Sequence, residues 1–425
     1  MKFLRFISLA LSGIAALPLF AEGEFVFNSE ISAIAPVGQQ FQVLGRVVNT
    51  TDEQIEGFTL SVTIGDKVYT NDFDTRIVVS GGSSDITWPV GFVPDRTGDY
   101  PYTVTLVSGG ETCWTGTGLV HVRTRRWVVE ERTGTWCAAC PAGIYVFEQM
   151  KEKLGDEFIG IALHTYGNDP MGVLNYQLSE FTDDSSAPYT MINRARGCHP
   201  LKLEQELTTM ARRSLKASFE EASCELSEDK SEVRVNTSVM FDADYTSSSA
   251  ELRIGYFIIE NDVNVDSPEY SQKNGFAGNP NSEIPGWDAL PPVIPGKDMY
   301  YQHVGRGFSE SVLGVAGSVP ARVEAGECYD YTHTFTLPDN ILNVENCKLV
   351  IMAIEARSKN VLNGIELPLN GSYSGVGSIA QDADVSDSET PRYYDLNGMS
   401  VGRAQMRPGI YVELKGSKAR KVIIK

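Results

Sequence analysis

The chain has 425 residues, enough for several domains that each bury a core. It is 42% hydrophobic and 21% charged, which excludes a collagenous or largely disordered protein. The formal net charge of −19 disfavours contact with nucleic acid backbones and anionic lipids, so the sequence predicts neither as a partner.

The first residues have the parts of a secretory signal peptide. Lys2 and Arg5 give a positive start, an apolar run follows over 6–20, and Ala21 ends a plausible cleavage site. The run is too short for a membrane span, although an uncleaved anchor is the alternative. No later stretch reaches the length of a transmembrane helix. We therefore expect an exported protein without a transmembrane segment once residues 1–21 are removed.

Residues 22–124 are a succession of short strand-like runs. Runs such as FQVLGRVVNT and YPYTVTLVSG alternate apolar and polar residues, and Gly, Asn, Asp and Pro separate them. This pattern is typical of an immunoglobulin-like β-sandwich. It contains no catalytic constellation, so we interpret it as a spacer or binding module.

Strand-like and helical patterns alternate over residues 125–217. RRWVVEE reads as a buried strand, and apolar residues at helical spacing follow over 140–154, with Gly155 placed to end that helix. EFIGIALH and APYTMINR read as strands, whereas MGVLNYQLSEF and 201–217 read as helical. The alternation predicts an α/β unit, a central sheet flanked by helices.

Strand patterns return over residues 218–370. AELRIGYFIIEN and KLVIMAIEAR have the strand period, and the irregular stretch 262–310 is rich in Pro, Gly, Asn and Tyr. We predict a second β-sandwich with one long loop. Residues 371–391 have the composition of a linker, and 392–425 read as a compact set of short strands.

The stretch TGTWCAACPAG places Cys137 and Cys140 at the start of the predicted helix. Free N–H groups and the partial positive charge at a helix N-terminus lower the pKa of a thiol. With Cys137 at the cap and Cys140 in the first turn, Cys137 can attack as a thiolate and Cys140 can then release the mixed disulfide. Trp136 would shield this site and offer an apolar surface to a substrate. His164 ends a strand at the same edge, where we expect a structural role, with proton handling as the alternative.

Two other interpretations of the cysteine pair stay open. It is a static disulfide, or it forms a metal site with Cys198 and His199, although the spacing matches no familiar zinc pattern. We predict no cofactor and no metal. Disulfides persist outside the cytoplasm, and the odd total of seven cysteines leaves at least one unpaired in a monomer. Cys328 and Cys347 are candidates for a second bridge.

TWCAAC, between a buried strand and a helix, resembles the active site of the thioredoxin superfamily. Trp136 matches the aromatic residue usual in that family. The resemblance implies that Pro188, in SSAPYTMINR, is the cis-proline that positions substrate. It also implies that Glu131 is the buried acid that assists proton transfer to Cys140, unless the strand register shifts by one and gives that role to Glu130. The Ala-Ala pair between the cysteines departs from the thioredoxin Gly-Pro and leaves the reduction potential open.

Two further resemblances concern location. Residues 125–360 are similar to a family of outer-membrane-associated thioredoxin-like proteins, the relatives of a twenty-eight-kilodalton outer membrane protein. That similarity implies a thioredoxin fold joined to a β-sandwich. The end of the chain, MRPGIYVELKGSKARKVIIK, resembles the sorting domain of the type IX secretion system. This implies the secretion machinery as a partner and a cell-surface, outer-membrane or secreted location; a β-tail without sorting function is the alternative.

Taken together, the sequence predicts a multidomain protein in which a thioredoxin-like α/β fold is flanked by immunoglobulin-like β-sandwich domains, with a small β C-terminal sorting domain. The leading hypothesis is thiol–disulfide exchange on extracytoplasmic proteins through Cys137 and Cys140. The alternative is a non-catalytic binding or structural protein that keeps a static disulfide on a thioredoxin scaffold. A buried Cys137 or a trans Pro188 would favour this alternative.

Overall fold

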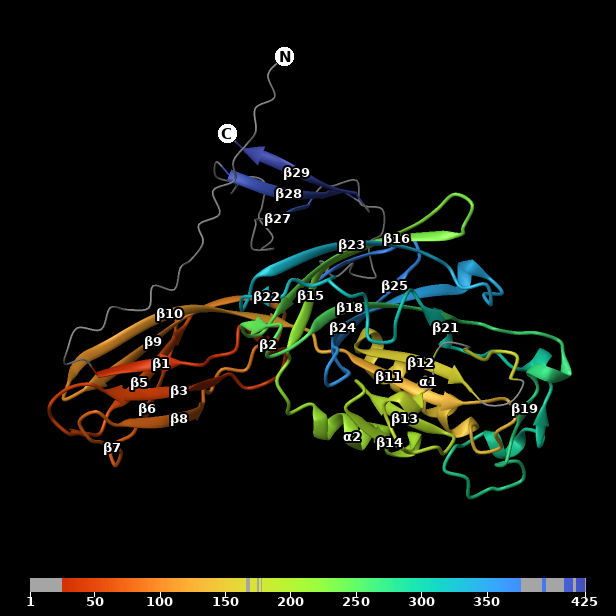
Figure 1. Ribbon diagram of the computed structural model, residues 1–425, viewed down its shortest axis with the longest axis horizontal. Coiled ribbons are helices and arrows are strands. Elements are labelled where there is room, and N and C mark those ends of the chain that lie inside the picture. The colour runs from red at the N-terminus through yellow and green to blue at the C-terminus, as the bar shows by residue number, and fades with distance from the viewer. Residues whose placement is uncertain are drawn as a thin grey trace, which may run out of the picture. The chain divides into compact units, whose positions relative to one another are not determined.

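The computed structural model describes residues 25–165, 169–173, 176 and 178–375, together with the backbone of three strands between residues 392 and 424 (Figure 1). It is mostly β-sheet with few helices, and the chain divides into two compact units. The first comprises Met1–Asp95 and Asp99–Val122, and the second comprises Arg96–Gly98 and Arg123–Lys425.

The first unit is a sandwich of two sheets. One has the strand order β1-β3-β8 and the other the order β2-β10-β9-β5-β6. Strands such as β5 alternate buried and half-buried residues, so that side chains like Val43, Leu60 and Leu106 form the core between the sheets. The β-rich prediction for this segment is confirmed. The strands are β1 (Phe25–Ser29), β2 (Ile34–Pro36), β3 (Gln42–Asn49), β4 (Ile55–Glu56), β5 (Thr59–Ile64), β6 (Lys67–Asp72), β7 (Ile77–Val78), β8 (Ser83–Pro89), β9 (Gly98–Ser108) and β10 (Glu111–Arg123).

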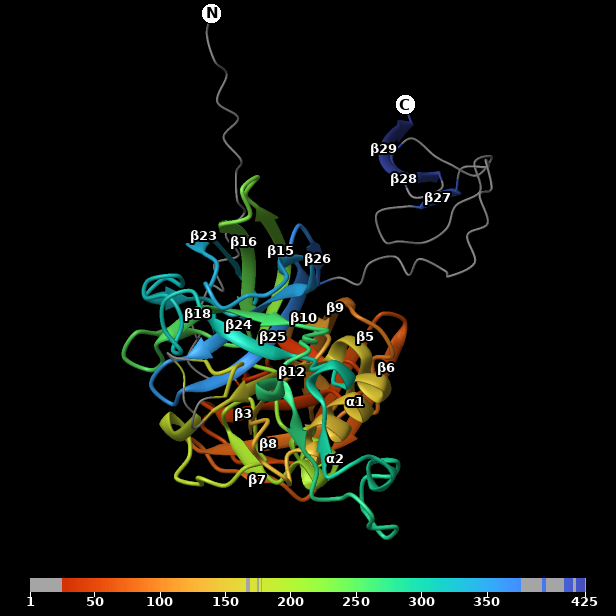
Figure 2. The same cartoon turned by 90° about the vertical axis from the view of Figure 1, so that its right-hand side faces the viewer.

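The second unit is built on one eight-stranded sheet of order β14-β13-β11-β12-β21-β18-β24-β25 (Figures 1 and 2). Its neighbours β11, β12 and β21 are parallel, and the other pairs are antiparallel. In chain order its strands are β11 (Trp127–Thr133), β12 (Phe158–His164), β13 (Tyr189–Ile192), β14 (Arg196–Cys198), β18 (Leu252–Glu260), β21 (Val304–Phe308), β24 (Cys347–Glu355) and β25 (Asn360–Pro368).

Strand β21 corrects the expected boundary at residue 217. It pairs with β12 on one side and with β18 on the other, so one sheet runs through both the 125–217 and the 218–370 segments. The sequence of β21, VGRGF, contains two glycines and an arginine, which have little intrinsic preference for strands. Only the pairing on both sides makes this stretch a strand, which is why it was expected to belong to the long loop.

Two α-helices cover one face of β11–β14. Helix α1 (Pro141–Leu154) packs Phe147 and Met150 against the strand residues Val129 and Phe158. Helix α2 (Leu203–Met210) is shorter than the helix expected over 201–217: residues 211–216 are turns and irregular chain, and Ala217 begins a strand. Of the helix expected in MGVLNYQLSEF, the described residues contain only the 3₁₀ turn η2 (Leu178–Glu180). Among the described residues, no helix is both long and apolar enough to cross a membrane.

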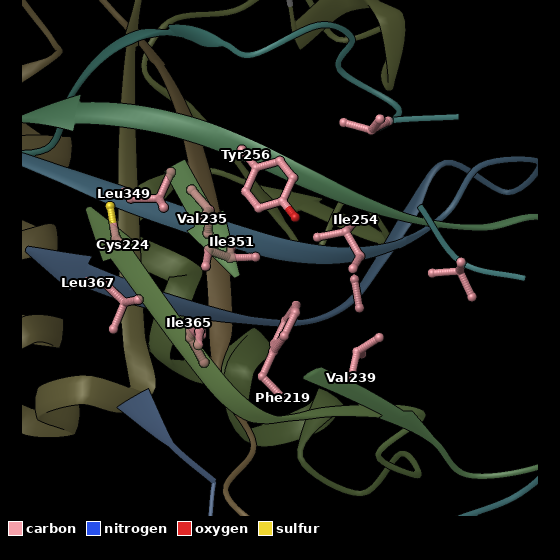
Figure 3. Close-up of a cluster of buried hydrophobic side chains, with 14 of the residues drawn as sticks. Phe219, Cys224, Val235, Val239, Ile254, Tyr256, Leu349, Ile351, Ile365 and Leu367 are labelled. Carbon is pink, nitrogen blue, oxygen red and sulfur yellow. The ribbon is translucent and has the colours of Figure 1, made fainter. Parts of the chain in front are cut away.

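A four-stranded sheet of order β23-β16-β15-β26 packs on the eight-stranded sheet and completes the second sandwich. Figure 3 shows the core between them, where Phe219, Val235 and Val239 from one sheet meet Ile254 and Leu349 from the other. The strands are β15 (Ala217–Leu226), β16 (Glu232–Phe241), β23 (Cys328–Thr336) and β26 (Ser372–Ser374). Strand β26 corrects the expected linker, whose start at residue 371 is part of the fold; residues 376–391 lie outside the described residues, as does the expected signal peptide.

The long irregular stretch between β18 and β21 contains only short elements, and the chain end forms a separate sheet of order β27-β28-β29. The remaining short elements and tail strands are η1 (Gly155–Glu157), η3 (Pro200–Lys202), β17 (Tyr245–Thr246), η4 (Pro268–Tyr270), β19 (Gln272–Lys273), η5 (Trp287–Ala289), β20 (Val293–Ile294), η6 (Gly296–Asp298), β22 (Arg322–Val323), η7 (Val344–Asn346), β27 (Arg392–Tyr394), β28 (Gly409–Lys415) and β29 (Lys418–Ile424).

Candidate functional site: a disulfide at a helix start

Cys137 and Cys140 form a disulfide where the chain passes from β11 into α1. Cys140 is the N-cap residue of α1 and Pro141 is the first helical residue, a position where the missing N–H costs no hydrogen bond. Cys140, which was expected inside the first turn, is the N-cap residue itself. Cys137, which was expected at the cap, lies three residues before it, outside the helix. The backbone N–H groups of Cys140, Ala142 and Gly143 are used for turn hydrogen bonds, so what the helix start offers the cysteine pair is its partial positive charge.

Pro188 lies against this disulfide. The Ala187–Pro188 peptide bond is cis, and the Cys137 sulfur is 3.5 Å from the carbonyl oxygen of Ala187. Pro188 is buried while Ala187 is half-buried. The two segments lie far apart in the sequence and meet because β13, which follows Pro188, pairs antiparallel with β11.

Glu131 lies beneath the first turn of α1. It is 1% exposed, and its Oε1 has no hydrogen-bond partner among the described residues. A Cβ at Gly143 would be 1.6 Å from this Oε1, so the carboxyl group touches the helix backbone three residues after Cys140. Burial raises the pKa of Glu131 well above its usual range, partly offset by a hydrogen bond with Thr133.

Glu130 faces the other side of the sheet. Its carboxylate forms a buried ion pair with Arg194, with Nη2 2.8 Å from Oε1. Side chains alternate along a strand, so only one of the two neighbouring acids reaches the helix. The register therefore places Glu131, and not Glu130, on the side of the cysteine pair.

A small cavity adjoins Glu131. It has a volume of about 20 Å³ and is lined by His164, Tyr301 and His303 as well as Glu131. This is room for about one water molecule. Burial lowers the pKa of His303 to about 4, with Lys151 and Lys348 adding to the effect and Glu366 opposing it.

Trp136 and His164 help to fix the loop that carries Cys137. Trp136 is 40% exposed, and its Nε1 donates to the carbonyl oxygen of Thr165 over 3.0 Å. The Nδ1 of His164 is 3.1 Å from Oδ1 of Asp169, whose Oδ2 accepts from the backbone N–H of Thr135 over 2.8 Å. Burial alone would raise the pKa of Asp169. The pKa is nevertheless lowered overall, because His164 and the backbone N–H groups of Thr135 and Met171 stabilise the carboxylate. His164 thus has the structural partner that the sequence analysis expected.

Sequence reasoning missed a strap that crosses the cysteine loop. The Nε2 of Gln272 donates to the carbonyl oxygen of Cys137 over 3.0 Å, and the backbone N–H of Gly275 donates to that of Ala138 over 2.8 Å. Lys273 N–H donates to the carbonyl oxygen of Thr135 over 2.9 Å. Gln272–Gly275 therefore hold one side of the loop by backbone-directed bonds. No local pattern predicted this, because the contacts are long-range.

Arg132 was missed as well. Its Nη1 donates to the carbonyl oxygens of Asp184 and Ser186 over 2.6 and 3.0 Å. Arg132 is 1% exposed, so these bonds form in a dry environment. They tie the segment before Pro188 to the end of β11. The only signal that the sequence offered was the presence of an arginine in the strand-like run WVVEERT.

The other cysteines are free thiols. Cys328 and Cys347, expected as a possible bridge, lie in different sheets and are unpaired, as are Cys113, Cys198 and Cys224. Within the described residues no three His, Cys, Asp or Glu side chains gather as a metal site requires. His199 instead accepts a hydrogen bond from the backbone N–H of Leu201.

The two structural criteria for a static disulfide give opposite answers. Cys137 is only 5% exposed, which favours a static bond, whereas the cis bond at Pro188 favours exchange.

No family model and no curated protein matches the chain. Among solved structures, HBP35 of Porphyromonas gingivalis matches with a TM-score of 0.41 at 12% identity, over 71% of this chain and 98% of that chain. A protein of Agrobacterium tumefaciens matches with a TM-score of 0.34 at 15% identity, over 57% of this chain and 94% of that chain. The CARDB domain of the PF1109 protein of Pyrococcus furiosus matches with a TM-score of 0.20 at 16% identity, over 24% and 90%. Because all these scores lie below 0.5, function is inferred from the site geometry alone.

Proposed function

We propose that the second unit is a thioredoxin-like thiol–disulfide exchange module that acts on exported proteins through Cys137 and Cys140. The observation that carries this proposal is the contact between the Cys137 sulfur and the carbonyl of Ala187, just before cis Pro188. A peptide that hydrogen-bonds the backbone of Ala187 has its own sulfur brought to Cys137. Proximity of this kind supplies much of the rate in exchange reactions.

The reaction starts from the disulfide form. A substrate thiolate attacks the Cys137 sulfur, the Cys137–Cys140 bond breaks, and Cys140 leaves as a thiolate that takes a proton from Glu131. A second substrate thiolate then attacks the substrate sulfur of the mixed disulfide. Cys137 leaves with the electron pair, so the substrate is oxidised to a disulfide and the cysteine pair is reduced. The reverse sequence reduces a substrate disulfide, and the redox partner decides the direction.

The test uses the full chain with Cys137→Ser and Cys140→Ser variants. We expect insulin reduction and oxidative refolding activity in the parent protein, loss of both with Cys137→Ser, and a trapped mixed disulfide with Cys140→Ser. The reduction potential of the pair should lie between about −120 and −270 mV, the range of exchange enzymes. Activity of Cys137→Ser equal to that of the parent would refute the proposal.

A second candidate function is a binding or structural protein with a static disulfide. It is favoured by the 5% exposure of Cys137 and by the strap over the loop. It predicts a potential below about −300 mV, as in structural disulfides, and the same equilibration measurement decides between the two.

We also propose that residues 1–21 direct export and that residues 392–425 engage the type IX secretion machinery. The antiparallel pairing of the tail strands β28 and β29 and the basic end KARKVIIK support the proposed role of residues 392–425. Removing residues 392–425 should leave the protein in the periplasm of a host with that machinery. Unchanged surface delivery of the truncated chain would show that the tail does not sort.

A further inference from the structure

An exposed apolar run lies in the insertion between β18 and β21, next to the strap Gln272–Gly275. Leu290, Pro291, Pro292 and Val293 follow one another from the end of η5 into β20, and all four are exposed. The leucine is 39% exposed and the valine 53%. Runs of this length are unusual on a protein surface unless they serve an interaction, because apolar groups gain free energy when they leave water.

The backbone of this apolar run is held by buried anchors. Asn274 is 3% exposed, and its Nδ2 donates to the carbonyl oxygen of Trp287 over 2.8 Å. The backbone N–H of Asn274 donates to the carbonyl oxygen of Pro292 over 2.8 Å. Ile294, directly after the run, is 4% exposed and packs in a cluster that includes Ile144 of α1. Such anchors keep the exposed side chains in a fixed place.

Backbone pairing connects the apolar run to the cysteine loop. Val293 pairs with Lys273 between β20 and β19, and the N–H of Lys273 donates to the carbonyl oxygen of Thr135 over 2.9 Å. Neighbouring strands lie about 4.8 Å apart, so Val293 is about 10 Å from Thr135. Cys137 follows two residues after Thr135, which leaves at most about 17 Å between Val293 and Cys137. About five residues of extended chain span that distance.

The apolar run and Trp136 share the solvent side of this pairing. Side chains alternate along extended chain, and Thr135 and Ile294 take the buried side, with exposures of 5% and 4%. Trp136 and Val293, one residue away from each of these, are 40% and 53% exposed. The exposed Lys273 lies between them. An apolar surface therefore extends from the tryptophan beside the disulfide to the apolar run.

We infer that residues 290–293 bind a large apolar side chain of the protein substrate, within about five residues of the substrate cysteine that reacts with Cys137. This inference rests on the proposed exchange function and adds a substrate class to it, exported chains that are unfolded around the cysteine. Folded proteins bury most of their large apolar side chains, whereas unfolded chains expose them. The occupant is a substrate because the surface is continuous with the cysteine loop, and a chain held at Ala187 has its flanking residues within reach.

The test measures exchange with single-cysteine peptides, using the full chain in its disulfide form without oxygen. Three peptides made of Gly and Ser carry leucine four residues after the cysteine, leucine four residues before it, or serine at both places. One peptide thiolate opens the Cys137–Cys140 bond and a second releases the first, so the cysteine pair is reduced and a peptide disulfide forms. Chromatography measures that peptide disulfide.

We expect at least one leucine peptide to react about tenfold faster than the serine peptide when the peptide concentration is low. A tenfold ratio corresponds to about 1.4 kcal/mol, about half of the free energy gained by burying a whole leucine side chain.

A double variant, Leu290→Ser with Val293→Ser, tests the apolar run itself. Both side chains are exposed, so the variant should fold. We expect its preference for the leucine peptide to fall below about twofold, while its rate with the serine peptide stays that of the parent. Leu342→Ser, at a leucine that is 54% exposed elsewhere in the second unit, is the matched control and should keep the preference.

The outcomes separate this inference from the exchange function. No reaction with any of the three peptides would refute the exchange function and the inference with it. Reaction at equal rates, or a leucine preference that the double variant keeps, would overturn the inference alone. Dimerisation of the parent that the double variant abolishes, measured by sedimentation, would identify a second copy as the occupant and would overturn the inference too.

Discussion

At the scale of single residues, the site depends on which side of a strand each acid faces. Glu130 and Glu131 are neighbours in β11 and both are buried. Glu130 is neutralised by Arg194, whose guanidinium also lies over the Phe181 ring. Glu131 has no such cation among its contacts, so burial raises its pKa and favours the protonated carboxyl group. The same residue type is thus ion-paired at one position and has a raised pKa at the next.

Glu131→Gln should make the stability of the protein less dependent on pH. A carboxyl group whose pKa is raised in the folded state contributes stability that is complete below its unfolded pKa and is lost as pH rises through its folded pKa. The melting temperature of the variant should therefore gain on that of the parent as pH rises from about 5 to 8. Thermal unfolding at several pH values, with the exposed Glu152→Gln as control, checks this. A constant difference between variant and parent would show that Glu131 is ionised in the fold.

Gly143→Ala should destabilise the protein even though alanine favours helices. The new Cβ would be 1.6 Å from the Glu131 Oε1, so the carboxyl group or the helix must move. The helix preference of alanine is worth about 1 kcal/mol, and overpacking costs about 1–3 kcal/mol. We expect a net loss in the free energy of unfolding, measured with denaturant. In a Glu131→Ala background the same change should become stabilising; a loss of equal size there would locate the strain elsewhere.

At the scale of elements, the insertion between β18 and β21 acts as a strap on the cysteine loop. Its irregular composition predicted a long loop, but Gln272 and Asn274 are buried and their amide groups are used for backbone hydrogen bonds. Buried polar side chains with satisfied bonds make a loop rigid. The strap therefore holds the cysteine loop with residues that lie outside the 125–217 segment.

Gln272→Ala should make the disulfide easier to reduce. The change removes the bonds from Nε2 to the carbonyl oxygens of Gly134 and Cys137, which hold a cysteine that is only 5% exposed. With about 1 kcal/mol for each of the two hydrogen bonds, opening of the loop should be about thirtyfold more frequent. The rate of reduction by a small phosphine measures this, and Asn281→Ala, at an exposed position of the same insertion, is the control. Equal rates for the variant and the parent would mean that the strap does not limit access.

At the scale of the whole second unit, one sheet joins what the sequence separates. Ile159 and Ile161 of β12 pack in the same cluster as Phe257 of β18 and Met352 of β24. Much of the apolar surface of β11 and β12 is thus buried by strands that follow residue 217.

An isolated fragment of residues 125–217 should therefore not fold, whereas a fragment of residues 123–375 should. The shorter fragment exposes the apolar face that Phe257, Val350 and Met352 cover, and it lacks β21 beside β12. Amide dispersion in NMR spectra and cooperative unfolding distinguish the two states. A folded 125–217 fragment would show that the α/β part is autonomous despite the shared sheet.

The sequence by itself determined the elements whose signal is local. The strand at 158–164 is a nearly continuous apolar run, the strand at 127–133 begins with the apolar WVV, and the helix ending before Gly155 has a regular apolar stripe, so their identity follows from residue order alone. The cysteine pair at the helix start could be located for the same reason, whereas the resemblance implied Pro188 and, with Glu130 as the alternative, Glu131. Only the tertiary structure decided the strap at Gln272, the anchoring by Arg132 and the strand β21. Each of these depends on contacts between residues far apart in the chain, and the free energy of such contacts is not written in any local pattern.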